Sequence, residues 1–465
     1  MNPRILAAET PAHLDQTVTL KGWVHVRRDM GKIIFIHLRD RSGQVQVVFV
    51  PGECPDYELA KTLRDEFVVA ITGQVAKRGP KNVNANMLTG TVEIQARALE
   101  VLSAAQTPPF PLADTQPVSE DARLTYRYLD LRSPRMNENI RFRSRVNMFL
   151  RNYLVTEGFT EIETPYITKG TPEGAREFII PSRQHAGQFY VLPQSPQQFK
   201  QLLMVGGLER YFQIVRCFRD EDQRGDRQPE FTQLDLEMSF VEQADVLELV
   251  ERMFTALVTE LCPEKTFTAT PFPRITYAEA MAKWGNDKPD IRKNPSDPNE
   301  LGFCFIVDFP LFEYSDAEKK LVSTHHLFTS PQAADLPLLD TDPSKVKGQQ
   351  YDFVLNGFEI AGGSIRIHDQ ELQRKIFKIL KLSDEEIETK FGHMLRAFSY
   401  GVPPHGGIAP GLDRIVMLLR NEPNIREVIA FPKTGDARDL MMGAPSELPP
   451  TALREAHIQL RSKKE

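Results

Sequence analysis

The feature that most constrains the fold is strict alternation near the middle of the chain, within residues 211–240. From Gln233 to Phe240, polar and apolar side chains alternate without a break, which is the period of a β-strand. An upstream run, residues 212–219, alternates in the same way, and a polar loop from Asp222 to Pro229 joins the two runs. The stretch predicts a β-hairpin whose apolar face, up to and including Phe240, packs on a core.

The other face of this hairpin carries arginines, short acids and amides instead of the scattered lysines and threonines of an ordinary exposed sheet. Its members are Arg219, Glu221, Gln228, Gln233, Asp235 and Glu237. Such a face suits a small zwitterion together with a phosphate. A salt-bridged outer surface explains the alternation equally well, so the pattern alone leaves both interpretations open.

The composition is that of a globular protein. The chain has 465 residues, 41% hydrophobic and 26% charged, enough for two or three domains. A net charge of −6 gives no overall basic field, so DNA is not an expected partner. Apolar runs too short to cross a membrane, and a start without signal-peptide character, predict a cytoplasmic protein. The four cysteines form no CxxC pair, which predicts reduced core thiols and neither zinc nor disulfides.

The N-terminal part predicts a five-stranded barrel. Strand-like segments at 16–26, 32–39, 44–50, 66–76 and 90–102 surround one short helix at 57–63, which is the order of the oligonucleotide-binding OB-fold. Basic residues gather on the first three strands, where Phe35 can stack on a base and Gln46 can hydrogen-bond one. A place in the core remains the other interpretation of Phe35.

A proline-rich segment follows the barrel and predicts a hinge. We therefore expect a barrel domain at 1–103, a hinge at 104–135 and a second domain at 136–465. The second domain opens with an apolar stripe that predicts a helix ended by Gly158, then a strand, FTEIETP, closed by Pro165. The stripe consists of Phe142, Val146, Phe149, Leu150, Tyr153 and Leu154. Such a stripe is usually core, although a long helix before an edge strand can also form a dimer interface.

Two helix starts bring charged or polar side chains to positions that suit a site. After Pro196, a predicted helix projects Gln197 and Lys200 from one face of its first turn; a solvated surface lysine is the alternative. Near the C-terminus a glycine-rich strand runs into an amphipathic helix with Arg414 in its first turn, which suits a phosphate.

Two extended stretches also carry candidate site residues. The adjacent His325 and His326 alternate on a strand-like segment, so one can face a site while the other packs, and their spacing makes zinc an unlikely ligand. In residues 351–369 the pair Gly362-Gly363 interrupts an alternating run and predicts a bulge. That bulge would turn Glu359 and Arg366 toward one cavity.

Taken in order, these stretches resemble the three motifs of class II aminoacyl-tRNA synthetases: FTEIETP with its preceding helix, FRDEDQRGDRQPEFTQLDLEMSF, and GGIAPGLDRIVMLL. More narrowly, the chain resembles aspartyl-tRNA synthetases of the bacterial type through GWVHVRRDMGKIIFIHLRDRSG, TPEGARE, LPQSPQQFKQ, HHLFTSP and EIAGGSIRIH. The resemblance covers nearly the whole chain. It implies an α+β fold, in which an N-terminal five-stranded OB-fold barrel precedes a catalytic domain with an antiparallel sheet flanked by helices. It also implies a homodimer formed through the motif 1 helix and strand.

The resemblance implies an aspartate–tRNA ligase that activates L-aspartate with ATP to aspartyl-adenylate and transfers it to the 3′ end of tRNA-Asp. The implied aspartate-binding residues are Glu173, Gln197, Lys200, Arg219, Asp235, His325 and Arg366. Lys200 and Arg366 would hold the side-chain carboxylate, and Asp235 would lie near the ammonium. Two cations for one carboxylate discriminate against the neutral amide of asparagine.

The implied ATP-binding residues are Arg219, Asp220, Glu221, Gln228, Glu359, Gly411, Leu412, Asp413 and Arg414. Arg219 would contact the α-phosphate and Arg414 the γ-phosphate; with Glu359 they are the implied catalytic residues. Glu359 and Asp352 would coordinate Mg²⁺. No side chain acts as a nucleophile, so catalysis consists of positioning and charge stabilisation.

On the barrel, the resemblance implies anticodon binding by Arg28, Phe35 and Gln46. Relatives that also charge tRNA-Asn with aspartate tend to carry His near position 30, whereas this chain has Met30, together with Lys81. These two residues favour strict specificity for tRNA-Asp, with the relaxed enzyme as the alternative.

Two departures from the family pattern stand out. The inserted domain that bacterial members carry is absent near residues 293–302, and Leu327 stands where the histidine motif usually has proline. A non-catalytic RNA-binding paralogue should have lost Arg219, Glu359 or Arg414, and all three are present. A free-standing asparagine synthetase would lack the barrel.

Overall fold

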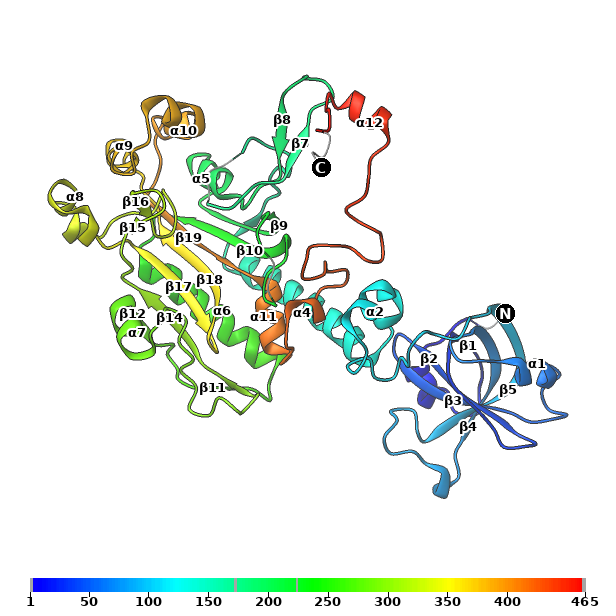
Figure 1. The fold of residues 1–465 in the computed structure, drawn as a ribbon. Helices are drawn as coiled ribbons and strands as arrows, with labels where there is room; N and C mark the ends of the chain where they lie inside the picture. Colours follow the sequence, from blue (N-terminus) through cyan, green and yellow to red (C-terminus); the bar gives the residue numbers. More distant parts are fainter. Residues whose placement is uncertain (1–2, 171–173, 223–224, 462–465) are drawn as a thin grey trace. The chain divides into compact units, whose positions relative to one another are not determined.

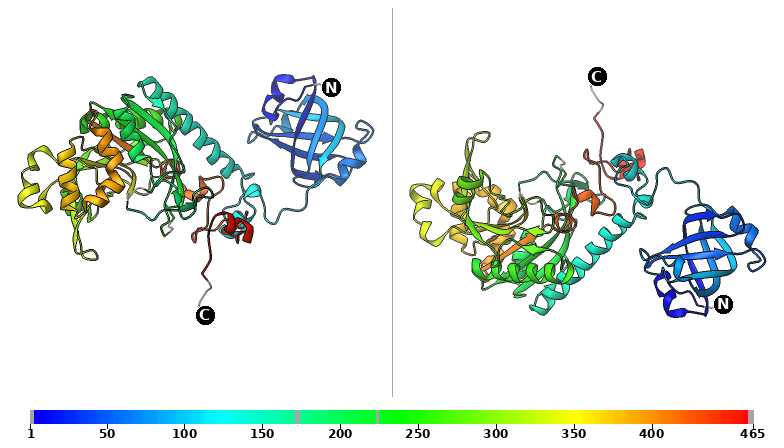
Figure 2. Two further views of the ribbon diagram at one scale, coloured as in Figure 1. Left: turned by 90° about the horizontal axis from the view of Figure 1, so that it is seen from above. Right: turned by 90° about the horizontal axis from the view of Figure 1, so that it is seen from below.

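The computed structural model describes residues 3–170, 174–222 and 225–461. The chain divides into two compact units, Met1–Leu112 and Ala113–Glu465 (Figures 1 and 2). The four cysteines are buried and free, which confirms the expected thiols. Among the described residues, no helix is both long and apolar enough to cross a lipid bilayer.

The first unit is a closed five-stranded barrel with the strand order β1-β2-β3-β5-β4, as the sequence predicts. Its elements are β1 (Thr17–Asp29), β2 (Ile34–Asp40), β3 (Gly43–Phe49), α1 (Tyr57–Thr62), β4 (Val68–Lys77) and β5 (Val92–Ser103). Alternate residues such as Val24, Ile36 and Val47 are fully buried inside the barrel. The residues between them, Phe35 among them, point outward.

The second unit is built on an eight-stranded sheet with the order β12-β14-β17-β18-β19-β10-β9-β6. The strands are β6 (Thr160–Glu161), β9 (Arg210–Phe218), β10 (Glu230–Ser239), β12 (Arg274–Thr276), β14 (Phe303–Val307), β17 (Gln350–Leu355), β18 (Phe358–Ile365) and β19 (His405–Pro410). The expected antiparallel pairing holds for the six inner strands, whereas β12 and β6 pair with their neighbours in parallel. Within the expected strand FTEIETP, only two residues pair, and they lie at one edge of the sheet.

The central hairpin, β9 and β10, divides its side chains between two environments. Leu234, Leu236 and Met238 enter the main hydrophobic core, while the alternate polar residues occupy the other face of the sheet. The prediction for Phe240 was wrong: this residue has φ 59° and is 68% exposed. Its left-handed backbone lies beyond the end of β10, so its side chain leaves the core.

Three helices cover the apolar face of the sheet: α4 (Pro134–Thr156), α6 (Gln243–Leu261) and α11 (Leu412–Leu419). The predicted stripe on α4 is confirmed as core, since Phe142, Val146, Leu150 and Leu154 are at most 2% exposed. After α4, Gly158 takes φ +82°, a conformation that suits glycine.

The predicted bulge exists, but not at the glycine pair. The register between β17 and β18 shifts from Phe353 opposite Ala361 to Val354 opposite Glu359, so Ile360 is the extra residue. Gly363 is required for a different reason, because a Cβ there would lie 2.3 Å from the carbonyl oxygen of Gly407. One extra residue changes the alternation by one step, which brings Glu359 and Arg366 to the same side of the sheet.

The segment expected as a hinge, 104–135, contains α2 (Glu120–Thr125) and α3 (Arg127–Asp130), and its second part belongs to the second unit. The remaining helices are α5 (Gln197–Val205), α7 (Tyr277–Trp284), α8 (Leu338–Thr341), α9 (Gln370–Ile379), α10 (Asp384–Phe398) and α12 (Pro450–Glu455). The remaining strands form three pairs: β7 (Ile179–Pro181) with β8 (Phe189–Val191), β11 (Thr266–Phe267) with β13 (Glu300–Leu301), and β15 (Phe312–Ser315) with β16 (Lys320–Ser323). Helix α7 and the two strands before it, β11 and β12, lie in residues 263–298, where no element was expected.

Candidate active site

The polar face of the sheet forms the floor of a cavity of about 360 Å³. The start of α5, the end of β18 and the first turn of α11 converge on it, as their sequences predict. The predicted site residues that line it are Gln197, Lys200, Arg219, Glu221, Gln228, Asp235, His325, Glu359, Arg366, Gly411, Asp413 and Arg414. The hairpin face is therefore a cavity floor, and the interpretation as a solvated outer surface was wrong.

Some predicted residues lie elsewhere. Leu412 is fully buried in the hydrophobic core, because it is the apolar first residue of α11. Asp220 and Asp352 are not among the described residues that line the cavity. Glu173 lies outside the described residues.

A buried charge cluster occupies one end of the cavity. Lys200 Nζ lies 2.9 Å from Asp235 and 3.3 Å from Glu237, and Arg366 Nε donates to Glu237 at 2.9 Å. Burial alone would raise the pKa of Glu237, but Arg366 and Lys200 outweigh it and lower this pKa to about 2. Glu237 therefore holds both cations from beneath the cavity.

Both histidines line the cavity, whereas the sequence allowed for one that faces a site and one that packs. His326 also packs its ring against Phe328, with ring centroids 4.7 Å apart. For His325, the desolvating cavity walls and then the Arg366 guanidinium lower the pKa to about 4. The same causes lower the pKa of His326. Both rings are neutral at pH 7.

Two further arginines line the cavity, Arg219 and Arg414. The Arg219 guanidinium lies over the Phe231 ring at 5.0 Å, which fixes a flat cation at the hairpin loop. Arg414 donates to the carbonyl oxygen of Glu359 at 2.7 Å and pairs with Asp226 at 3.0 Å. Two arginines that are held in this way suit a bound polyphosphate.

Two predicted ATP ligands have other partners. The Asp413 carboxylate bonds to Arg143 of α4 and accepts from the Thr232 amide at 2.9 Å, so it ties α11 to α4 and β10. Gln228 exchanges two hydrogen bonds with the backbone of Lys433, at 3.0 and 2.7 Å. Its amide is thereby committed to the C-terminal segment, which the sequence did not indicate.

Two carboxylates converge beside Gly362. A Cβ at this glycine would lie 3.3 Å from Asp352 Oδ1 and 3.9 Å from Glu359 Oε1. Burial, and then the Glu359 charge, raise the pKa of Asp352. Burial alone would also raise the pKa of Glu359, but Lys288, whose Nζ lies 3.0 Å away, outweighs it and lowers this pKa. Two crowded carboxylates that need a counter-charge fit a divalent cation.

This pair is not a complete metal site. Within the described parts of the chain, no group of three or more His, Cys, Asp or Glu side chains is arranged to hold a metal ion. Mg²⁺ commonly binds through one or two carboxylates and takes its remaining ligands from water and substrate phosphates, so the pair suits that ion.

On the barrel, Arg28 and Phe35 are register partners on β1 and β2. Phe35 is half-buried on the outward side of β2, so it is not an interior core residue. Gln46 is held on both ends of its amide, by Glu93 at 2.8 Å and Arg78 at 2.7 Å. The two residues of the specificity prediction, Met30 and Lys81, are exposed.

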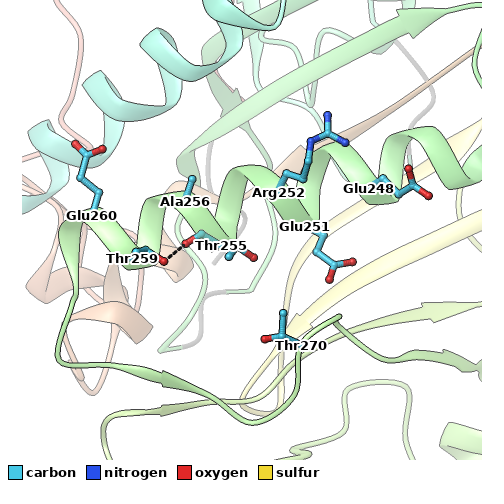
Figure 3. Close-up of a pocket in the computed structure, with 8 residues that line it drawn as sticks. All are labelled: Glu248, Glu251, Arg252, Thr255, Ala256, Thr259, Glu260 and Thr270. Atoms are coloured by element: carbon cyan, nitrogen blue, oxygen red, sulfur yellow. Dashed lines mark hydrogen bonds between the residues drawn. The ribbon is translucent and has the colours of Figure 1, made fainter.

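A second hollow, of about 720 Å³, lies along the outer side of α6 (Figure 3). Helix surface residues and Thr270 line it, and none of the predicted site residues is among them. Thr259 donates back to the Thr255 carbonyl at 2.8 Å, which is a bond within the helix. This hollow brings no group of catalytic side chains together.

Sequence reasoning missed several residues that support the cavity. Gln201 and His405 are fully buried beneath it, and Lys288 reaches Glu359 from the loop after α7. Helical spacing places Gln201 four residues after Gln197, so that pair had a signal. Lys288 had none, because its contact joins segments far apart in the sequence.

Comparisons with known proteins agree with the fold. Residues 119–435 match the family model of tRNA synthetases class II (D, K and N), and residues 18–102 match the OB-fold nucleic acid binding domain. The aspartate–tRNA(Asp/Asn) ligase of Rubrobacter xylanophilus is 45% identical, covering 97% of this chain and 95% of that protein. The aspartate–tRNA ligase of Geobacillus kaustophilus is 41% identical, covering 95% and 96%.

The fold has solved counterparts as well. The aspartyl-tRNA synthetase of Entamoeba histolytica superposes with a TM-score of 0.73 at 25% identity, covering 93% of this chain and 91% of that one. The alignment with the Rubrobacter protein runs over 572 positions although this chain has 465 residues, so the relative carries more than a hundred internal residues that this chain lacks. These matches show that the chain belongs to the class II tRNA synthetases, in the family that serves aspartate, lysine and asparagine.

Proposed function

We propose that the protein is an aspartate–tRNA ligase: it activates L-aspartate with ATP and transfers the aspartyl group to tRNA-Asp. The observation that carries the proposal is the buried cluster in which Lys200 and Arg366 line the same end of the cavity. With the Asp235 carboxylate assigned to the substrate ammonium, Lys200 and Arg366 share one remaining acid, Glu237. A side-chain carboxylate balances the second positive charge, whereas a neutral amide would leave it unbalanced. The names of the relatives at 41–45% identity support the same substrate.

In this proposal aspartate lies on the cavity floor. Its side-chain carboxylate meets Lys200 and Arg366, with His325 close by, while its ammonium group meets Asp235 and Gln197. Glu237 keeps both cations in place beneath the substrate. Glu173, also assigned to the ammonium group, stays a prediction from the sequence.

ATP, which the family uses, occupies the other end. Arg219 contacts the α-phosphate and Arg414 the γ-phosphate, with Glu221 at the adenine and the Gly411 backbone beside the phosphates. The α-carboxylate oxygen of aspartate attacks the α-phosphorus in line, the bond to the bridging oxygen breaks, and pyrophosphate leaves. Arg219 stabilises the charge that develops at phosphorus. The terminal ribose hydroxyl of tRNA then attacks the adenylate carbonyl, and AMP leaves.

Mg²⁺ is the proposed metal, held by Glu359 and Asp352. When bound, it supplies positive charge to the phosphate oxygens. The crowded pair of carboxylates beside Gly362 supports this assignment.

The barrel is proposed to bind the anticodon through Arg28, Phe35 and Gln46. We propose a homodimer through α4 and β6, supported by Met148 and Val155, which are 56% and 58% exposed on α4, and by the open edge of the sheet at β6. Light scattering after size-exclusion chromatography tests the dimer, and a mass of one chain at micromolar concentration would contradict it.

Charging of tRNA-Asn with aspartate is a second candidate activity. The printed name of the Rubrobacter relative includes both tRNAs, whereas that of the Geobacillus relative does not. Met30 and Lys81 favour strict specificity, and aminoacylation of the two tRNA transcripts side by side decides between the two activities.

The activation step is tested by amino-acid-dependent ATP–pyrophosphate exchange without tRNA. Exchange with aspartate and background exchange with asparagine is the expected result. Exchange with asparagine alone would overturn the assignment of Lys200 and Arg366, and no exchange with either would favour a non-catalytic RNA-binding protein.

A further inference from the structure

A row of three buried side chains beneath the cavity connects a backbone carbonyl to Gln197. His405 Nδ1 lies 2.8 Å from the carbonyl oxygen of Pro403. Gln201 Nε2 lies 3.2 Å from His405 Nε2, and Gln197 Nε2 lies 3.2 Å from Gln201 Oε1. Gln201 and His405 are fully buried and Gln197 is 4% exposed. These four residues are termed the polar relay.

The direction of every hydrogen bond in the relay follows from its first member. The Pro403 carbonyl can only accept, so Nδ1 of His405 must carry the proton. In a neutral imidazole, Nε2 is then an acceptor, and Gln201 must turn its NH₂ group toward it. The carbonyl of Gln201 is left to accept from the NH₂ group of Gln197.

The neutral state of the ring has a physical cause. Burial lowers the pKa of His405, and the nearby Glu237 only partly opposes this effect. The backbone of His405 is also fixed, because it pairs with Ser239 of β10 and its carbonyl accepts from the Arg366 amide at 2.9 Å. The sheet therefore fixes the backbone that carries the ring, while full burial and the two ring hydrogen bonds hold the ring's orientation.

At the cavity, these hydrogen bonds determine the orientation of the Gln197 amide. Gln197 lines the cavity, and its NH₂ group is committed to Gln201. Its carbonyl oxygen is the end left for a ligand, since none of the described residues donates a hydrogen bond to it. A carbonyl oxygen attracts an ammonium group, whereas an NH₂ group in the same place would repel it.

We infer that Gln201 and His405 are positioning residues for the amino-acid substrate: they hold the Gln197 amide so that its Oε1 accepts from the α-ammonium group. The inference rests on the proposed function, which assigns that group to Gln197. It adds two residues, outside the cavity wall, that determine how tightly the amino acid binds.

Steady-state exchange kinetics test this role. Gln201→Met should raise the KM for aspartate about three- to tenfold, the size of one lost hydrogen bond, with kcat and the KM for ATP changed less than about twofold. Gln198→Met is the matched control, because Gln198 is buried on the same helix and the hydrogen bonds to Gln197 and His405 come from Gln201. In a Gln197→Met background, adding Gln201→Met should change the KM no further. An unchanged KM in the single variant, or additive effects in the double variant, would overturn the inference.

A second measurement does not depend on activity. Long-range ¹H–¹⁵N spectra of the ¹⁵N-histidine-labelled wild type report which ring nitrogen carries the proton, and His405→Gln assigns the signal. A neutral ring protonated on Nδ1 at pH 7.5 is expected. A proton on Nε2, or on both nitrogens, would overturn the inference. If the wild type shows no aspartate-dependent exchange, the proposed function fails, whereas this spectrum still decides the direction of the relay.

Discussion

At the scale of single residues, the cations of the cavity differ in whether a buried acid balances their charge. Lys200 and Arg366 are each paired with a buried acid from β10, so they are rigid before any ligand arrives. Arg219 has a different kind of support, the face of Phe231, which holds the guanidinium without neutralising it. Arg219 is therefore the cation best placed to stabilise new negative charge.

Arg219→Ala is expected to reduce aspartate-dependent pyrophosphate exchange by about 10²- to 10³-fold, the usual effect of removing one charge-stabilising donor. Arg216→Ala is the control, because Arg216 lies on β9, three residues before Arg219, and pairs with Glu230 at 2.8 Å. Rates near wild type in the Arg219 variant would refute its role at the α-phosphate.

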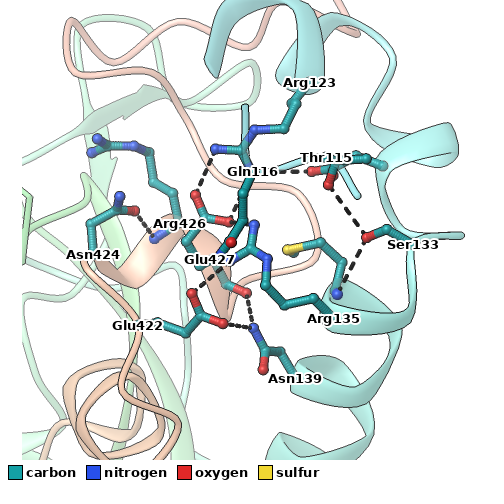
Figure 4. A network of polar contacts seen from close by, with 12 residues as sticks. Thr115, Gln116, Arg123, Ser133, Arg135, Asn139, Glu422, Asn424, Arg426 and Glu427 are labelled. Carbon is teal, nitrogen blue, oxygen red and sulfur yellow. Dashed lines mark hydrogen bonds and ion pairs between the residues drawn. The ribbon is translucent and has the colours of Figure 1, made fainter. Parts of the chain in front are cut away.

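At the scale of elements, a buried polar network fastens α2 and α4 to the segment after α11 (Figure 4). Arg123 donates two hydrogen bonds to Glu427, at 2.8 and 2.7 Å, and Arg135 donates a third at 2.8 Å. Because these elements adjoin α11, the network supports the helix that presents Arg414 to the cavity.

Glu427 gives a pH-dependent prediction. Burial alone would raise its pKa, but the two arginines outweigh it and lower the pKa to about 2. The carboxylate therefore stabilises the fold above its unfolded pKa near 4.5, and this contribution is lost as the pH falls toward 2. Glu427→Gln should cost about 3 kcal/mol at pH 7 and flatten the decline in stability between pH 4.5 and 3.

Urea unfolding at several pH values measures this effect. Glu455→Gln, at an exposed position of α12, is the control and should leave both the stability and its pH dependence unchanged. A Glu427 variant that keeps the wild-type slope below pH 4.5 would contradict the assigned ion pairs.

The loop after α7 gives a second prediction at this scale. Lys288 is the counter-charge of Glu359, at the position where the proposed Mg²⁺ would add its own charge. Lys288→Met should lower the melting temperature without Mg²⁺ and increase the stabilisation that Mg²⁺ produces. Lys293→Met, in the same loop, is the control. Equal thermal shifts with Mg²⁺ in the Lys288 variant and the wild type would argue against a shared site.

How well the sequence predicted each element depended on whether its signal was local. The hairpin β9–β10 and the helix α4 follow from alternation and from a stripe ended by Gly158. Helix α7 also had local sequence signals: Thr276 and Glu279 form a capping box, and Gly285 follows its last residue. The surrounding prolines were interpreted as irregular structure, so the helix was not predicted. The bulge at Ile360 could not be predicted, because it depends on the register with β17, which is a tertiary property.

At the scale of the whole molecule, two units serve two recognition tasks. The barrel presents Arg28 and Phe35 as register partners on its outward side, which suits stacking on a single-stranded base. The second unit holds the cavity. The sequence predicts that the missing internal residues would fall near 293–302, where Glu300 accepts from the amides of Lys293 and Asn294 at 2.9 and 2.8 Å.

Phe35→Ala separates the two tasks. It should lower kcat/KM for tRNA charging by about ten- to a hundredfold, since one base–aromatic stack contributes about 1–3 kcal/mol, while pyrophosphate exchange stays at the wild-type rate. Leu88→Ala, at a barrel position that is 81% exposed, is the control. A loss confined to exchange would refute the anticodon role.

The central claim is that one chain both activates aspartate and delivers it to tRNA-Asp. Aminoacylation of a tRNA-Asp transcript with radiolabelled aspartate, with labelled asparagine and labelled lysine in parallel, tests this claim most directly. The account predicts acid-stable label on the tRNA with aspartate alone, at a rate reduced about 10²- to 10³-fold after Arg219→Ala. Label from asparagine or lysine, or aspartate-dependent exchange without any label on tRNA, would contradict it.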